Sequence, residues 1–300
     1  MKRFTSRSLA SKGLAPLALL SITVIWGWTF VLVKEGITVV GPFTFLTFRF
    51  ALAFLCLALL LFRSLRGIDR RALLCGGMVG GALFLGYFFQ TWGLATTTAT
   101  KSGLITGLSV VIVPVLAAIL LKERVRLSLW LGALSATGGL ALLVLGKGTL
   151  TAFNVGDLLT LLCALFFAGH ILLVDRFIRV VDYRHLLLVQ VGTVALLSLI
   201  GALFVEGLTF VPSPKLIEGV LVTGLLATAL ALYILNRFQR HSTASYTAII
   251  LTMEPIFAGL FGFLLLGETL SILQLMGGGM ILVGMGIPSF LVRGLPSSEG

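Results

Sequence analysis

The sequence has 300 residues, of which 58% are apolar and 11% are charged. A soluble domain carries about 25% charged residues, so a chain this apolar cannot cover a water-exposed surface and is predicted to lie mostly in lipid. The net charge of +11 is compatible with nucleic-acid binding, but the basic residues lie in short loops between apolar runs, as in membrane proteins. We therefore expect no nucleic-acid partner.

Ten apolar runs are long enough to cross a bilayer, which takes about 20 helical residues. The connections between them are short and leave no room for a soluble domain. Residues 1–14 and 293–300 are expected to be tails. The sequence therefore predicts an all-α polytopic membrane protein, whose spans are 15–34, 43–62, 72–91, 99–121, 127–146, 157–175, 185–205, 216–236, 244–266 and 271–292.

The loops between these spans alternate in charge. Most of the 22 Lys and Arg residues lie in the N-terminal segment and in every second loop. Such an excess marks the cytoplasmic side, so both termini are predicted to be cytoplasmic. We expect a multi-pass protein of the bacterial cytoplasmic (inner) membrane.

One stretch of the chain occurs twice. Residues 98–125 read TATKSGLITGLSVVIVPVLAAILLKERV, and residues 243–270, which lie 145 positions later, read TASYTAIILTMEPIFAGLFGFLLLGETL. This spacing is about half the chain and predicts duplication of a whole five-helix bundle, 15–146 and 157–292. We refer to these ranges as the first and second copies. Because five spans is an odd number, the second copy is predicted to be inverted in the membrane, with a substrate site between the copies near the midplane.

Several short motifs occur in a fixed order along the chain: Ile25–Phe30 with Lys34, Pro42 with Arg49, Ala95–Lys101, the helix endings 120–123 and 265–268, and the glycines of the fifth and tenth spans. In these motifs the sequence resembles the EamA family of the drug/metabolite transporter superfamily. The resemblance covers nearly the whole chain and implies ten spans, export or exchange of small metabolites such as amino acids, and no use of ATP. We expect no cofactor and no metal.

Glu254 is the strongest candidate for a functional residue, because it lies in the middle of the predicted span 244–266 and ionisable groups inside a span are costly. The equivalent position in the first copy is Ser109, so the fold does not require a charge there. Pro255 frees the backbone carbonyl of Leu251. A loosened helix beside a carboxylate suits a cation, a proton or an amino group. The alternative is a carboxyl that is protonated or paired with a structural arginine.

Two further residues share helical faces with Glu254 and its mate Ser109. Tyr246 lies two turns before Glu254, and Lys101 lies two turns before Ser109, so both stripes are expected to line one cavity. Lys101 could receive a substrate carboxylate, or it could extend to the lipid headgroups.

Two pairs of residues place an aromatic ring and an amide three positions apart on one helical face: Tyr87 with Gln90, and Tyr233 with Asn236. Such a pair suits a small zwitterion with an apolar side chain. The alternative is hydrogen bonding between helices.

Four more residues lie inside predicted spans. Trp26 and Trp28 lie in mid-span rather than at the interface where Trp is usual, so they are expected in the cavity or between the copies. His170, which a shift of 141 relates to Thr29, is either a hydrogen-bonded packing residue or part of a proton relay. Arg49 lies about two turns into its span. It either pairs with a carboxylate from another helix, the structural arrangement that we favour, or faces the cavity.

These features favour a secondary transporter, with export as the expected direction and the proton as a candidate coupling ion through Glu254 or His170. An uncoupled facilitator, an exchanger or a channel is the alternative. The motifs G-x-S-x-G, H-E-x-x-H and the ATP-binding P-loop are absent from the sequence, so we do not expect an enzyme.

Overall fold

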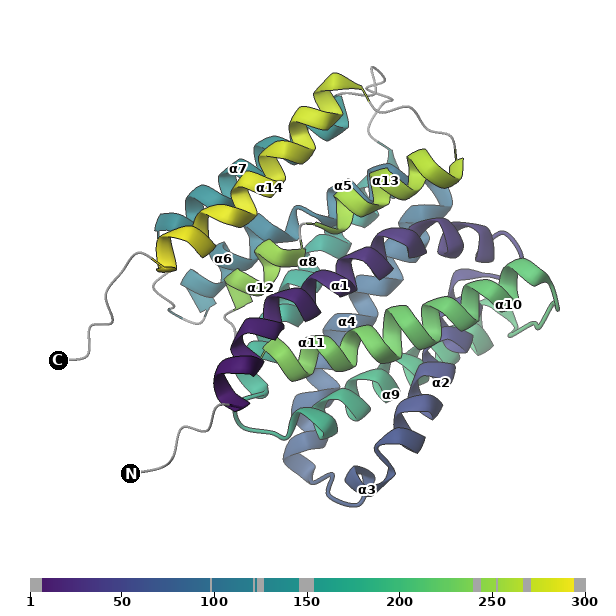
Figure 1. Ribbon diagram of the computed structural model, residues 1–300. Coiled ribbons are helices and arrows are strands. Elements are labelled where there is room, and N and C mark those ends of the chain that lie inside the picture. Colours follow the sequence, from purple (N-terminus) through teal and green to yellow (C-terminus); the bar gives the residue numbers. More distant parts are fainter. Residues whose placement is uncertain are drawn as a thin grey trace, which may run out of the picture.

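The computed structural model describes residues 7–97, 99–120, 122, 127–145, 154–239, 244–251, 253–266 and 271–293. Every regular element within these ranges is a helix (Figure 1). In chain order they are α1 (Arg7–Gly36), α2 (Pro42–Leu60), α3 (Phe62–Leu65), α4 (Arg70–Thr96), α5 (Ala99–Thr106), α6 (Ser109–Leu120), α7 (Leu127–Leu145), α8 (Val155–Phe177), α9 (Tyr183–Gly201), the π-helix η1 (Ala202–Glu206), α10 (Pro214–Leu221), the π-helix η2 (Val222–Leu230), α11 (Ala231–Gln239), α12 (Ala244–Leu251), α13 (Glu254–Leu266) and α14 (Ile272–Arg293).

Six helical segments in the described part of the chain are long and apolar enough to cross a membrane. Large apolar side chains on their outer faces are exposed, such as Leu59 at 77% and Phe204 at 86%. Such surfaces are unfavourable in water and suit lipid, so the protein is an integral multi-pass membrane protein. The six segments are Pro16–Gly36, Pro42–Leu60, Arg70–Thr96, Val155–Phe177, Tyr183–Glu206 and Pro214–Gln239.

The fourth and ninth predicted spans are each divided into two helices. α5 ends at Thr106 and α6 begins at Ser109, whereas α12 ends at Leu251 and α13 begins at Glu254. The shift of 145 maps the first break onto the second. Pro255 is the second residue of α13, where its missing N–H costs no hydrogen bond.

Helices from the two halves of the chain are in close contact. α4 packs along α8 and α9, and α1 packs along α13 and α11. A Cβ atom added to Gly156 of α8 would lie 2.6 Å from the carbonyl oxygen of Gly93 of α4, so these two helices meet backbone to backbone. α7 and α14 lie side by side along one edge of the bundle (Figure 1), where Ser135 Oγ donates a hydrogen bond to the carbonyl of Met280 at 2.9 Å.

The carboxylate of Glu206, the last residue of η1, caps the N-terminus of α2. Its Oε1 accepts from the backbone N–H of Phe43 at 2.9 Å, and its Oε2 accepts from the N–H and the hydroxyl of Thr44, both at 2.8 Å. Gly207 then ends η1 with a φ of +78°, a conformation that suits glycine. The carboxylate thus joins the second copy to the start of a helix in the first.

Candidate functional site

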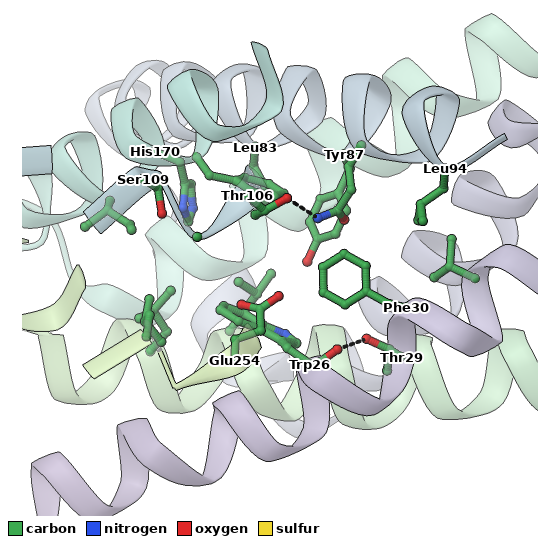
Figure 2. A pocket seen from close by; sticks show the side chains of 18 of the residues that line it. Trp26, Thr29, Phe30, Leu83, Tyr87, Leu94, Thr106, Ser109, His170 and Glu254 are labelled. Carbon is green, nitrogen blue, oxygen red and sulfur yellow. Dashed lines mark hydrogen bonds between the residues drawn. The ribbon is translucent and has the colours of Figure 1, made fainter. Parts of the chain in front are cut away.

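A cavity of about 70 Å³ lies between α1, α2, α4, α8 and α11, beside the two helix breaks (Figure 2). Most of its lining residues form pairs related by the two sequence shifts. A shift of 141 relates three pairs, and a shift of 145 relates four. The pairs are Trp26 with Phe167, Thr29 with His170, Phe30 with Ile171, Tyr87 with Leu232, Gln90 with Leu235, Thr106 with Leu251 and Ser109 with Glu254.

Glu254 is the first residue of α13 and is partly exposed to the cavity. Figure 2 shows its carboxylate pointing into the open space. Among the described residues, no cation or hydrogen-bond donor contacts this carboxylate. Glu254 lies at the N-terminus of its own helix, where the aligned peptide dipoles favour negative charge.

His170 lines the cavity and begins a chain of three hydrogen bonds. His170 Nε2 lies 2.8 Å from Gln190 Oε1, Gln190 Nε2 donates to Asn236 Oδ1 at 2.9 Å, and Asn236 Nδ2 donates to the carbonyl of Leu232 at 2.9 Å. A backbone carbonyl can only accept, so each group in the chain must donate toward it. The neutral imidazole therefore carries its hydrogen on Nε2 and keeps a lone pair on Nδ1.

Arg49 also lines the cavity, although its side chain is only 2% exposed. Its Nε donates to Thr228 Oγ1 at 2.8 Å and its Nη2 donates to Tyr87 Oη at 3.2 Å, while the guanidinium lies 4.4 Å from the centre of the Tyr87 ring. The expected ion pair with a carboxylate is not found in the described part of the structure. Hydroxyls and an aromatic face take the place of that carboxylate.

Tyr87 and Gln90 line the cavity, and Gln90 Nε2 donates to Thr106 Oγ1 at 3.4 Å. The second pair with this spacing is not among the lining residues. Tyr233 Oη instead accepts from Arg237 Nη1 at 2.8 Å, and Asn236 lies behind His170 in the chain described above.

Tyr233 and Asn236 do not face the cavity because of their position in the helical register. The shift of 145 makes Leu232 and Leu235 the mates of the lining pair on α4, and these two leucines do line the cavity. Tyr233 and Asn236 come one residue later, which turns their side chains by about 100° around the helix axis.

Four predicted site residues remain. Trp26 lines the cavity, and its Nε1 donates to the carbonyl of Ala227 at 2.8 Å. Trp28 is not a lining residue, and its ring packs against a phenylalanine of α13 with 6.4 Å between ring centres. The side chains of Lys101 and Tyr246 lie outside the described part of the structure.

Sequence reasoning did not select Thr29, Phe30, Thr106 or Gln190 as candidates. Thr29 is the repeat mate of the candidate His170, so applying the shift of 141 to that candidate would have found it. Phe30 and Thr106 are mates of Ile171 and Leu251, which were not candidates themselves, so the shifts alone would not have found these two. Gln190 is an amide within the predicted span 185–205, and the rule used for Glu254 applies to polar groups at such depth as well.

Comparison with known proteins shows the family. A model of the EamA-like transporter family matches residues 13–145 and, a second time, residues 154–289. The chain belongs to the EamA-like transporter family. The predicted resemblance is thereby confirmed, and the protein is a membrane transporter of this family.

Relatives of this EamA-like protein carry the same general description. It is 36% identical over 93% of its length to an uncharacterized transporter of Archaeoglobus fulgidus, covering 86% of that protein. It is 26% identical over 91% of its length to the uncharacterized transporter YoaV of Bacillus subtilis, covering 96% of that protein. A solved structure titled "Crystal structure of protein" has a TM-score of 0.72 at 20% identity, over 95% of this chain and 98% of the other. At that identity the likeness shows the fold alone.

Proposed function

We propose that this EamA-like protein is a secondary transporter that exports small metabolites such as amino acids through the cavity described above. The observation that carries this proposal is that both copies line the cavity at equivalent positions, including the two helix breaks. In transporters built from inverted repeats, the substrate site lies between the repeats beside discontinuous helices. The protein would not act as an enzyme.

The proposed architecture has ten spans in two inverted copies, with both termini in the cytoplasm of a bacterial cell. The contact between α7 and α14 supports the symmetry, since the shift of 145 relates Ser135 to Met280, and these two residues are hydrogen-bonded to each other. A residue that contacts its own mate lies close to the axis that relates the copies. The charge of the loops supports the orientation.

The size of the cavity favours alternating access. Ligand pockets commonly have volumes of about 300–1,000 Å³, whereas this cavity has about 70 Å³ and accommodates a few water molecules, each needing about 10–15 Å³. A metabolite would therefore enter only after the walls move apart. Rocking of one copy against the other would widen the cavity and open it to one side at a time.

Glu254 is proposed to couple transport to the proton. Its carboxylate faces the cavity without a cationic partner in the described residues, so a proton and a substrate ammonium would compete for it. His170, which also belongs to the second copy and lines the same cavity, offers a second acceptor at Nδ1. Competition of this kind produces proton antiport when each opening of the cavity releases one ligand and takes up the other.

The proposal is tested by transport in proteoliposomes after a ligand screen. Amino acids, amines and carboxylates would be screened for thermal stabilisation of the purified protein at about pH 6 and about pH 8, because a ligand of the folded state raises its apparent stability. We expect hits that weaken at the lower pH and that drive counterflow of a labelled copy. Glu254→Gln should abolish the pH dependence, while Glu218→Gln, at an exposed position of α10, should leave it intact.

Two outcomes would change the assignment. If Glu254→Gln retains both the transport rate and its pH dependence, proton coupling through this residue is wrong. If the hits are insensitive to pH but counterflow is saturable, the protein is an uncoupled facilitator or exchanger, and flux without saturation would indicate a channel.

A further inference from the structure

Arg49 is a buried cation without a carboxylate partner. A buried charge is costly unless it is paired, and the contacts of Arg49 in the described structure are neutral. Thr228 Oγ1 accepts a hydrogen bond from Nε and donates one to the carbonyl of Thr223 at 2.8 Å. Tyr87 offers its oxygen and its ring. This arrangement holds the guanidinium in place but does not neutralise it.

The fold does not require a charge at this position. α2 spans Pro42–Leu60 and α9 spans Tyr183–Gly201, so a shift of 141 superimposes both ends of the two helices. The same shift relates Arg49 to Gln190. The second copy therefore builds the equivalent position with a neutral amide, which is fully buried and hydrogen-bonded.

The donors left over at this part of the cavity suit an anion. Arg49 Nη1 has no hydrogen-bond partner among the described residues. Tyr87 Oη accepts from Arg49 Nη2 and so keeps its own hydrogen to donate. The indole N–H of Trp26 is already engaged with a backbone carbonyl. A guanidinium and a neighbouring hydroxyl can together bind the two oxygens of a carboxylate.

Two acceptors face another part of the cavity. Glu254 presents a carboxylate, and His170 presents the lone pair of Nδ1. Arg49 and Glu254 line the same cavity but do not form an ion pair with each other in the described structure. In Figure 2, Glu254 points into the cavity from the wall opposite Tyr87.

We propose that Arg49 is the anion-binding residue of the cavity. It holds the carboxylate of the substrate with Tyr87 Oη as the second donor, while the substrate ammonium faces Glu254. The substrate class is then a small zwitterion with an apolar side chain, which packs against rings such as Trp26, Phe30 and Phe167. This inference rests on the proposed transport function and adds that Arg49 selects substrates that carry a carboxylate.

The test compares three compounds of nearly the same shape. Leucine carries both charges, isoamylamine lacks the carboxylate and isocaproate lacks the ammonium. Counterflow of labelled leucine into proteoliposomes would be measured with each compound as competitor, or with phenylalanine and its corresponding amine and acid if leucine is not transported. The variants are Arg49→Gln, Arg49→Lys, Tyr87→Phe, Glu254→Gln and, as a control, Arg63→Gln, whose side chain is exposed on α3.

We expect the wild type to prefer leucine over isoamylamine by more than about tenfold, the size of one charge-assisted hydrogen bond. Arg49→Gln should abolish this preference, and Tyr87→Phe should reduce it while keeping the ring. Glu254→Gln should instead abolish the preference for leucine over isocaproate. The control should change neither ratio. A purely structural arginine would lower all rates together and leave both ratios unchanged.

The outcomes separate this inference from the proposed function. If counterflow persists in Arg49→Gln and Tyr87→Phe with an unchanged preference over isoamylamine, Arg49 does not bind the carboxylate, although the protein is still a transporter. Tyr87→Phe keeps the test valid even if both Arg49 variants fail to fold. If the wild type moves none of these zwitterions, the assignment of the substrate class is wrong. Absence of counterflow with every hit of the ligand screen would refute the transport function as well.

Discussion

Replacing Glu206 by glutamine would test how firmly the second copy is joined to α2. The carboxylate accepts three hydrogen bonds, two from backbone N–H groups at the first turn of α2 and one from the Thr44 hydroxyl. Glutamine has nearly the same shape but only one acceptor oxygen. If that oxygen faces Thr44, the amide NH₂ must face the N–H of Phe43, and two donors then point at each other.

The magnitude follows from the bonds that are lost. One hydrogen bond to a charged group contributes about 1.5–3 kcal/mol, and a negative charge at a helix N-terminus contributes about 0.3–1 kcal/mol. Together these terms amount to about 2–4 kcal/mol. Because Glu206 is only half-buried, water replaces part of the lost bonding, and we expect Glu206→Gln to lower the free energy of unfolding by about 1–3 kcal/mol.

Unfolding in detergent, followed by circular dichroism against temperature or denaturant, measures this loss. Glu218→Gln is the matched control, because Glu218 is exposed on α10 and a surface substitution usually changes stability by less than about 0.5 kcal/mol. If both variants unfold at the same midpoint as the wild type, the carboxylate does not hold the N-terminus of α2, and the argument from its three hydrogen bonds is refuted.

Two further predictions concern packing and protonation. Gly93→Ala should lower the free energy of unfolding by about 1–3 kcal/mol through overpacking, because its Cβ would lie 2.6 Å from a threonine hydroxyl of α8. Gly77→Ala on the same helix, whose Cβ would have nothing within 4 Å, should be neutral or stabilising. The unfolding midpoints of the two variants and the wild type measure the difference. Nitrogen-15 NMR of the neutral His170 ring should show hydrogen on Nε2. Gln190→Leu removes the acceptor for this hydrogen and should give a mixture of tautomers. Hydrogen on Nδ1 in the wild type would contradict the hydrogen-bond chain.

The helix breaks show where sequence reasoning succeeds and where it stops. Pro255 predicts a loosened helix at Leu251, and α12 does end there. The equivalent break between Thr106 and Ser109 has no such signal, because Pro114 lies inside α6, too far along to free a carbonyl at the break. Only the shift of 145 predicts the first break from the second. The proline thus predicts the break in the second copy, and the repeat relation predicts the equivalent break in the first.

Side-chain register and burial were harder to predict. Spacing alone shows that Tyr233 and Asn236 share a helical face but does not show whether that face points toward the cavity. The face that lines the cavity begins one residue earlier, at Leu232. The contacts of Arg49 come from hydroxyls on η2 and α4, elements that lie 179 and 38 residues away in the chain. Periodicity on α2 contains no information about such partners, so an ion pair was the expected arrangement.

The hydrogen-bond chain behind His170 has a consequence for proton leakage. It ends at the carbonyl of Leu232, a group that accepts a hydrogen bond but has no proton to pass on. A proton taken up at Nδ1 therefore has no onward route through Gln190 and Asn236 and must return by the way it came. This wall of the cavity insulates, so that a proton bound at His170 would cross the membrane only when the cavity itself changes the side to which it opens.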